Sequence, residues 1–332
     1  MNETTMDKLI KDFPQNIKDA LAIAGAVKLS SPTHEIRNVV VCGMGGSGIG
    51  GKIVSQWVYE DLSTPFTLVN DYTLPYFVNE HTLVIASSYS GNTEETLSAV
   101  EDGLNKNAHV VAICSGGKLE TLAKEKGFDA IIVPGGNPPR SALAFSLVQL
   151  VSIFEKLELV TIRYSAQLAQ SVELIQKNTS EIHAAAKQTA AFLKGKIPVI
   201  YATTLFEGIA VRARQQLNEN AKVLCWHHVI PEMNHNELVG WTGGNSNFAP
   251  LFLVNGDMYE RNAFRLNISK EVVEERGVST LFLNAKGTTR VEESMYFIHL
   301  IDWTSWYLSE LYAVDPIAIP VIDYLKGELD KF

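Results

Sequence analysis

The chain has 332 residues, of which 46% are hydrophobic and 20% charged, and its formal net charge at pH 7 is −9. This composition excludes a disordered chain, a collagen-like repeat and a small disulfide scaffold, and the acidic balance argues against a general nucleic-acid binder. No apolar stretch reaches the roughly 18–20 residues needed to span a bilayer, and the polar start MNETTMDKLIKDF is unlike a secretory signal.

Short β-branched runs alternate with longer amphipathic stretches in the first half of the chain. Continuous apolar runs of this length are typical of parallel strands covered on both faces. The predicted strands are Asn38–Cys42, Phe66–Asn70, Thr82–Ser87, His109–Cys114 and Ala130–Val133. The predicted helices are Ile49–Tyr59, Thr93–Asn105, Lys118–Lys126 and Ser141–Leu157. This alternation predicts a doubly wound α/β sheet.

The second half repeats this layout after a segment without Gly or Pro. That segment, Ser165–Leu193, predicts one long helix or a helical pair. The predicted strands that follow are Pro198–Ala202, Lys222–Trp226, Pro250–Asn255 and Ser279–Leu283. The predicted helices are Glu207–Leu217, Met258–Arg276 and Val291–Tyr312. We therefore expect two α/β domains, residues 1–157 and 158–332, each a mainly parallel sheet flanked by helices.

The three cysteines, Cys42, Cys114 and Cys225, lie far apart and inside apolar runs. Such positions favour buried, reduced thiols rather than disulfides. Together with the lack of a secretory signal, they predict a cytoplasmic protein.

A glycine-rich loop, GMGGSGIGG, directly follows the first predicted strand. Glycines let the backbone turn tightly and approach an anion, while the next helix points its free N–H groups at it. Gly43, Gly45 and Gly48 also match the dinucleotide pattern GxGxxG, although only Asp71 is available as a ribose partner after the second strand. A tight turn for close helix–sheet packing is the purely structural alternative.

A second loop, SSYSGNTEET at residues 87–96, follows the third predicted strand. Ser90 or Thr93 could serve only to cap the next helix. Taken together, however, the hydroxyls of Ser88, Ser90 and Thr93 at a helix N-terminus favour a neutral cradle for a phosphate monoester. Neither loop contains the lysine of a nucleoside-triphosphate P-loop, which argues against kinase chemistry.

These two loops resemble those of the sugar isomerase (SIS) domain, whose Ser/Thr-rich loop binds the phosphate of a phosphosugar. The resemblance continues through GGNPPR, NEN, PEMNHNE and IDYLKGEL, and so covers residues 43 to 329. The ordered set is similar to the bifunctional phosphoglucose/phosphomannose isomerases, a branch of the phosphoglucose isomerase superfamily with two SIS domains. It implies a phosphosugar substrate, no cofactor or metal, and a homodimer.

The resemblance also assigns roles to residues for moving a proton between C1 and C2 through an enediol(ate). Glu219 matches the catalytic base, and Arg140 offers a charged fork for the enediolate oxygen. His235 matches the ring-opening histidine, which in the family comes from the partner subunit, and Lys326 assists it. The phosphosugar is expected to be held by Gly45, Gly46, Ser47, Ser88, Ser90 and Thr93.

Each of these assignments has a simpler alternative from the sequence alone. Glu219 could be a solvated helix end, although a carboxylate there opposes the helix dipole. His235 could be an ordinary surface histidine, Arg140 an ordinary residue at a helix start, and Lys326 a solvent-facing lysine. The family threonine that is linked to the mannose epimer also has no counterpart in residues 313–326, which puts the mannose activity in doubt.

Three other functions remain as alternatives. A phosphosugar-sensing regulator without catalysis would use the same loops, but the sequence contains no helix-turn-helix followed by a basic surface. A metal enzyme could use the cluster His227, His228, Glu232, His235 and Glu237, although its spacing is irregular. A nucleotide-dependent oxidoreductase fits GxGxxG but leaves the Ser/Thr loop without a role.

Overall fold

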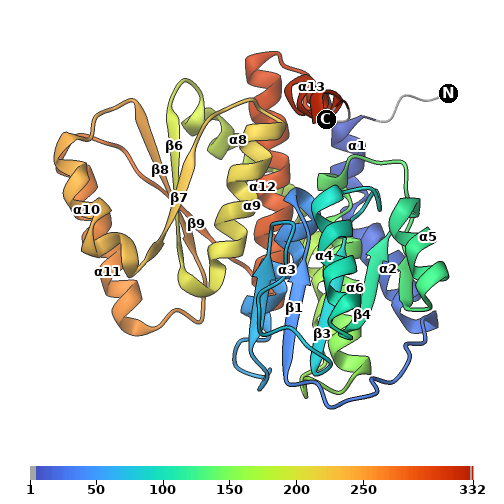
Figure 1. The fold of residues 1–332 in the computed structure, drawn as a ribbon. Helices are drawn as coiled ribbons and strands as arrows, with labels where there is room; N and C mark the ends of the chain where they lie inside the picture. Colours follow the sequence, from blue (N-terminus) through green and yellow to red (C-terminus); the bar gives the residue numbers. More distant parts are fainter. Residues whose placement is uncertain (1–4, 330, 332) are drawn as a thin grey trace.

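Two parallel β-sheets organise the chain in the computed structural model, which describes residues 5–329 and 331 (Figure 1). Residues 1–4, the first part of the polar segment MNETTMDKLIKDF that is unlike a secretory signal, lie outside the described residues. The strands are β1 (Asn38–Cys42), β2 (Phe66–Val69), β3 (Thr82–Ser87), β4 (His109–Cys114), β5 (Asp129–Ile132), β6 (Ile197–Thr203), β7 (Trp226–Ile230), β8 (Phe248–Val254) and β9 (Leu281–Asn284).

Helices connect almost all of these strands. They are α1 (Met6–Lys11), α2 (Phe13–Ala26), α3 (Gly45–Trp57), α4 (Glu94–Asn105), α5 (Gly117–Lys126), α6 (Leu143–Lys156), α7 (Tyr164–Lys177), α8 (Thr179–Leu193), α9 (Glu207–Glu219), α10 (Glu237–Gly240), α11 (Glu260–Glu274), α12 (Arg290–Tyr312) and α13 (Pro320–Leu329). Within the described residues, no helix has both the length and the apolar character needed to cross a membrane.

The first sheet has the strand order β2-β1-β3-β4-β5, and all of its strands are parallel. Alternate residues of each strand face opposite sides: Val39 and Val41 pack into the main core, whereas Val40 and Cys42 pack into a second cluster. That second cluster contains side chains of α4 and α5. The sheet is therefore covered on both faces, as continuous apolar strands require.

The second sheet has the order β7-β6-β8-β9 and is also parallel throughout. Ile200 and Ala202 of β6 face the main core with α9 and α12, while Val199 and Tyr201 face a third cluster that includes residues of α11. The predicted α/β architecture with two doubly wound sheets is confirmed.

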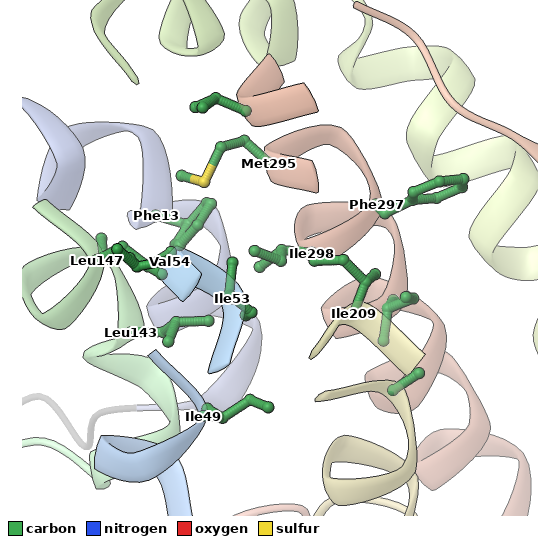
Figure 2. Close-up of a cluster of buried hydrophobic side chains, with 14 of the residues drawn as sticks. Phe13, Ile49, Ile53, Val54, Leu143, Leu147, Ile209, Met295, Phe297 and Ile298 are labelled. Carbon is green, nitrogen blue, oxygen red and sulfur yellow. The ribbon is translucent and has the colours of Figure 1, made fainter. Parts of the chain in front are cut away.

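The main core lies between the two sheets and is built largely from helices. Figure 2 shows Ile49 and Ile53 of α3, Leu143 of α6, Ile209 of α9 and Ile298 of α12 gathered in one cluster. All five are buried. Because residues of both halves share this cluster, apolar burial of about 25 cal/mol per Å² holds the halves against each other.

Most predicted elements are confirmed, with one strand placed wrongly. The Gly- and Pro-free segment forms the pair α7 and α8, and the three cysteines are buried and free. Lys222–Trp226, however, is not a strand, because β7 begins only at Trp226. Lys222 has the left-handed φ of 59° and Leu224 is 85% exposed, so the apolar residues before β7 belong to an irregular connection. The domain boundary after residue 157 falls between α6 and α7 and stays a prediction.

A buried ion pair connects α9 to α12. Arg212 Nη2 lies 3.0 Å from both carboxylate oxygens of Asp302, and both side chains are almost fully buried. The amide of Gln216 donates a third hydrogen bond of 2.7 Å to Asp302. Burial raises the pKa of Asp302 and its neighbour Arg212 opposes that change. Removing one partner would leave the other charge buried and uncompensated.

We therefore expect Asp302→Ala to lower the free energy of unfolding by about 3–5 kcal/mol, as for other broken buried pairs. Lys124→Ala is the control, because its pair with Glu120 is exposed and should contribute less than about 1 kcal/mol. Urea denaturation followed by circular dichroism measures both. Equal losses in the two variants would contradict the structural importance assigned to the buried pair.

Candidate active site

The two predicted ligand loops lie side by side, because β1 and β3 are neighbours in the first sheet. The glycine-rich loop leads from β1 into α3, and the Ser/Thr loop leads from β3 into α4. In open α/β sheets, ligands bind where the strand order reverses, at the carboxyl ends of the strands. The order β2-β1-β3 places that reversal between these two loops.

The glycine-rich loop combines tight packing with an open backbone. A Cβ on Gly43 would lie 2.5 Å from the Ser87 carbonyl, and one on Gly48 would lie 2.5 Å from the Gly43 carbonyl. The packing alternative is thus correct for these two glycines. Gly45, with φ of 50°, is exposed and has nothing within 4 Å of an added Cβ. A Cβ on Gly46 would lie 3.3 Å from the backbone nitrogen of Arg140.

Hydrogen bonds connect the two loops. Ser47 Oγ accepts from the backbone N–H of Tyr89 at 2.9 Å. Ser88 is buried and donates to Thr93 Oγ1 at 2.9 Å. Thr93 is the N-cap of α4 but makes no side-chain cap hydrogen bond, and Ser90 Oγ accepts from Asn92 N–H at 3.2 Å. The capping explanation for these hydroxyls is therefore wrong.

Arg140 lies close to Glu219, and the backbone of Arg140 adjoins the glycine-rich loop at Gly46. Arg140 follows β5 in a short 3-10 helix (Pro139–Ser141), and its side chain is only 3% exposed. Its Nη1 lies 3.2 Å from Glu219 Oε2. Burial lowers the pKa of Arg140, and the charge of Glu219 opposes that shift. A carboxylate at the end of α9 opposes the helix dipole, and the positive charge of Arg140 offsets that unfavourable interaction.

The antiparallel packing of α3 and α9 explains how distant residues meet. Gly208, at the start of α9, donates its N–H to Gln56 near the end of α3 at 2.9 Å. The opposite end of α9, at Glu219, therefore faces the start of α3, where the glycine-rich loop lies. The base predicted in the second half thus reaches the carboxyl edge of the first sheet.

Within one chain, His235 and Glu219 lie on different elements of the second half and do not adjoin in sequence. Glu219 ends α9 before β7 begins, whereas His235 follows β7 in a 3-10 helix (Glu232–His235). Glu219 ends the helix that covers the main-core face of the second sheet, whereas the segment after β7 packs on the opposite face, where Met233 belongs to the third cluster. Figure 1 shows α10, which directly follows His235, on the side of the second sheet away from α3. His235 is exposed.

Lys326 lies in α13, a helix without buried residues, and its side chain is exposed. The segment before α13 does reach the site, because Arg140 Nη2 donates to the carbonyls of Pro316 and Ile317 at 2.7 and 2.9 Å. Sequence reasoning missed these two acceptors. Backbone carbonyls leave no residue-type signal.

The residues of the considered metal cluster are dispersed. His227 Nε2 lies 3.6 Å from Glu207 Oε1, and the pKa of Glu207 is lowered to about 2, chiefly by His227 and also by Lys52. His228 Nδ1 lies 2.8 Å from Glu237 Oε2. Neighbouring strand residues thus pair with different carboxylates. In the part of the chain that the structure describes, no three His, Cys, Asp or Glu side chains are grouped to hold a metal.

Comparisons with known proteins identify the family of the chain. The SIS domain family matches residues 34–157, and the bacterial phospho-glucose isomerase C-terminal SIS domain family matches residues 182–329. A bifunctional phosphoglucose/phosphomannose isomerase from Aquifex aeolicus is 37% identical and covers 89% of this chain and 91% of its own. The chain belongs to this isomerase family.

A second such isomerase, from Caldicellulosiruptor bescii, is 36% identical over 98% of both chains. Among solved structures, the C-terminal domain of glucosamine-fructose-6-phosphate aminotransferase from Francisella tularensis is similar with a TM-score of 0.75. It covers 94% of this chain and 97% of its own, at 16% identity. That likeness establishes the shared fold of two SIS domains.

Gly91 allows a test of the Ser/Thr loop. Its φ is 67°, and an added Cβ would lie 1.8 Å from the Gly116 carbonyl. Gly127 is the matched control, with φ of 75° and nothing within 4 Å. We expect Gly127→Ala to cost about 1–2 kcal/mol for the left-handed backbone alone. Gly91→Ala should cost clearly more, because the loop must also shift. Equal losses on urea denaturation would contradict this close approach.

Proposed function

We propose that the protein interconverts glucose 6-phosphate and mannose 6-phosphate with fructose 6-phosphate. The observation that carries this proposal is the contact between Arg140 and Glu219, 3.2 Å apart, beside two loops of phosphate-binding type. A carboxylate that can move a proton and a cation that can stabilise an oxyanion are the two groups that aldose–ketose isomerisation needs. The names of the Aquifex and Caldicellulosiruptor relatives point to both sugar epimers.

In the proposed reaction, the two loops bind the phosphate through Gly45, Gly46, Ser47, Ser88, Ser90 and Thr93. Glu219 removes the proton from C2 of the open-chain aldose and returns it to C1, while Arg140 stabilises the enediolate oxygen. Glucose and mannose 6-phosphates differ only at C2, which becomes planar in the enediol, so one base can serve both epimers. The proton transfer leaves the overall redox state of the sugar unchanged and requires no redox cofactor.

We further propose a homodimer in which His235 of a second copy, with Lys326, opens the sugar ring. The opposite positions of Glu219 and His235 on the second sheet support this arrangement. Helix α13 supports a second copy as well: Val321 is 78% exposed and Tyr324 69% exposed, an unusual surface for a helix facing water alone. The acidic balance and the three buried thiols favour a cytoplasmic location.

A sensor that binds a phosphosugar without turning it over is the competing function. It would need the two loops, but it would not need a cation beside Glu219. Burying a guanidinium removes it from water at a cost of several kcal/mol, which a binding loop of hydroxyls and glycines does not require. The paired charges therefore favour catalysis.

Incubating the protein with fructose 6-phosphate and excess chelator, followed by NMR, tests the reaction directly. We expect both glucose 6-phosphate and mannose 6-phosphate to form. If only glucose 6-phosphate forms, the protein lacks the mannose activity, in agreement with the missing family threonine. Binding without turnover would favour the sensor.

The role of Glu219 is tested by Glu219→Gln, which keeps the shape of the side chain but removes the base. We expect kcat to fall by about 10²–10⁴-fold while sugar-phosphate binding, measured calorimetrically, remains. Glu207→Gln, at the other end of the same helix, is the control and should keep turnover. Unchanged kcat in Glu219→Gln would exclude this residue as the base.

Mixing two inactive variants tests the shared site. In a dimer of Glu219→Gln with His235→Ala, one site carries both defects and the other has both native residues. Random mixing makes half of the dimers mixed, so about one quarter of wild-type activity should return. Co-refolding the two variants and assaying turnover measures this. If both residues act within one chain, no activity returns.

A further inference from the structure

The guanidinium of Arg140 is held on almost every side. Nε donates to Asn220 Oδ1 at 2.8 Å, and Nη2 donates to the carbonyls of Pro316 and Ile317. Nη1 donates to Glu219. An arginine has five N–H donors, and these contacts account for four of them. The remaining donor is on Nη1, the nitrogen that lies beside Glu219, and it is the one available to a substrate oxygen.

Asn220 accepts from Nε, the donor that is not bonded to the backbone carbonyls. Its side chain is fully buried, and its Nδ2 donates to Ser305 Oγ at 2.9 Å. The Ser305 hydroxyl in turn donates to the Asp302 carbonyl at 2.7 Å. Because the Ser305 hydrogen is committed there, its oxygen must accept, which turns the amide nitrogen of Asn220 toward Ser305 and the amide oxygen toward Arg140.

We propose that Asn220 is a positioning residue that fixes the plane of the Arg140 guanidinium; this rests on the proposed function. Without an acceptor at Nε, the guanidinium can still tilt about its contacts at Nη1 and Nη2. Held also at Nε, it presents one Nη1 donor to Glu219 and one to the enediolate oxygen. Without Asn220, the buried Nε loses its acceptor, and a tilt of the guanidinium toward another acceptor would move the Nη1 donors away from Glu219 and the enediolate oxygen.

The geometry predicts an effect on turnover rather than on binding, because the hydrogen bonds of the Asn220 side chain go to Arg140 and Ser305. Asn220→Leu removes the acceptor at similar volume and should lower kcat by about 100-fold, the effect of a misplaced catalytic group. KM should change little. Asn220→Asp keeps an acceptor oxygen for Nε and should recover a large part of that loss.

Thr189→Val is the matched control, since Thr189 is fully buried in α8 and bonds only to the Ala185 carbonyl of its own helix. Both apolar variants remove a buried polar group. Measuring the free energy of unfolding of each variant therefore distinguishes a loss of stability from a loss of kcat caused by a misplaced guanidinium. Steady-state kinetics with fructose 6-phosphate compare all four proteins. A wild type without turnover would refute the proposed function itself.

With an active wild type, two results would overturn the role of Asn220 alone. One is a loss of kcat in Asn220→Leu no larger than in Thr189→Val. The other is a loss that appears mainly in KM, since binding would then depend on Asn220. A kcat of Asn220→Asp no higher than that of Asn220→Leu would also contradict the role of Asn220 as an acceptor.

Discussion

The placement of one buried cation constrains the rest of the structure. The Arg140 side chain is nearly inaccessible, and a guanidinium leaves water only when hydrogen-bond acceptors replace the lost hydration. Those acceptors come from the end of α9 and from the link between α12 and α13, while Arg140 itself follows the first sheet. The position of the second half relative to the first is therefore part of the same requirement that assembles the candidate site.

This requirement also explains why the two similar sheets contribute unequally. At the carboxyl edge of the first sheet, the loops after β1 and β3 expose hydroxyls and backbone. At the corresponding edge of the second sheet, the end of α3 is packed instead: Gln56 donates to the Thr204 carbonyl and accepts from Gly208. Lys52 of α3 adds an ion pair of 2.8 Å with Glu207. The second edge is used for contact between the halves, and α9 extends from it to supply Glu219.

The sequence was sufficient for the features that depend on local patterns. Strands with continuous apolar runs, such as β1, β3 and β4, were predicted at their observed bounds because both faces are buried. The strand β7 was missed because two histidines interrupt its letters WHHVI, whereas the segment before it is apolar. Histidines that pair with carboxylates can occupy an edge strand, which a hydrophobic pattern does not register.

The candidate site also contains features that local patterns predict and features that they do not. Loop residues were found from glycine and hydroxyl patterns, and Glu219 and Arg140 from ordered motifs. Their contact was not predictable from the sequence, because it depends on the antiparallel packing of α3 with α9, which brings residues 79 positions apart within hydrogen-bond distance. The amide of Asn220 was visible only as a neighbour of Glu219. Its function depends on Ser305, 85 positions away on α12.

The distribution of groups within one chain separates two parts of the proposed reaction. Arg140 and Glu219 are in contact inside a single copy, so the two groups proposed for proton transfer meet without a partner. His235 is exposed, on a short helix that packs on the face of the second sheet opposite α9. Ring opening would therefore depend on assembly, whereas proton transfer in a sugar already open would not. Association of two copies would then control how cyclic substrate enters the reaction, while the rate of the C1–C2 step would be set by contacts within each chain.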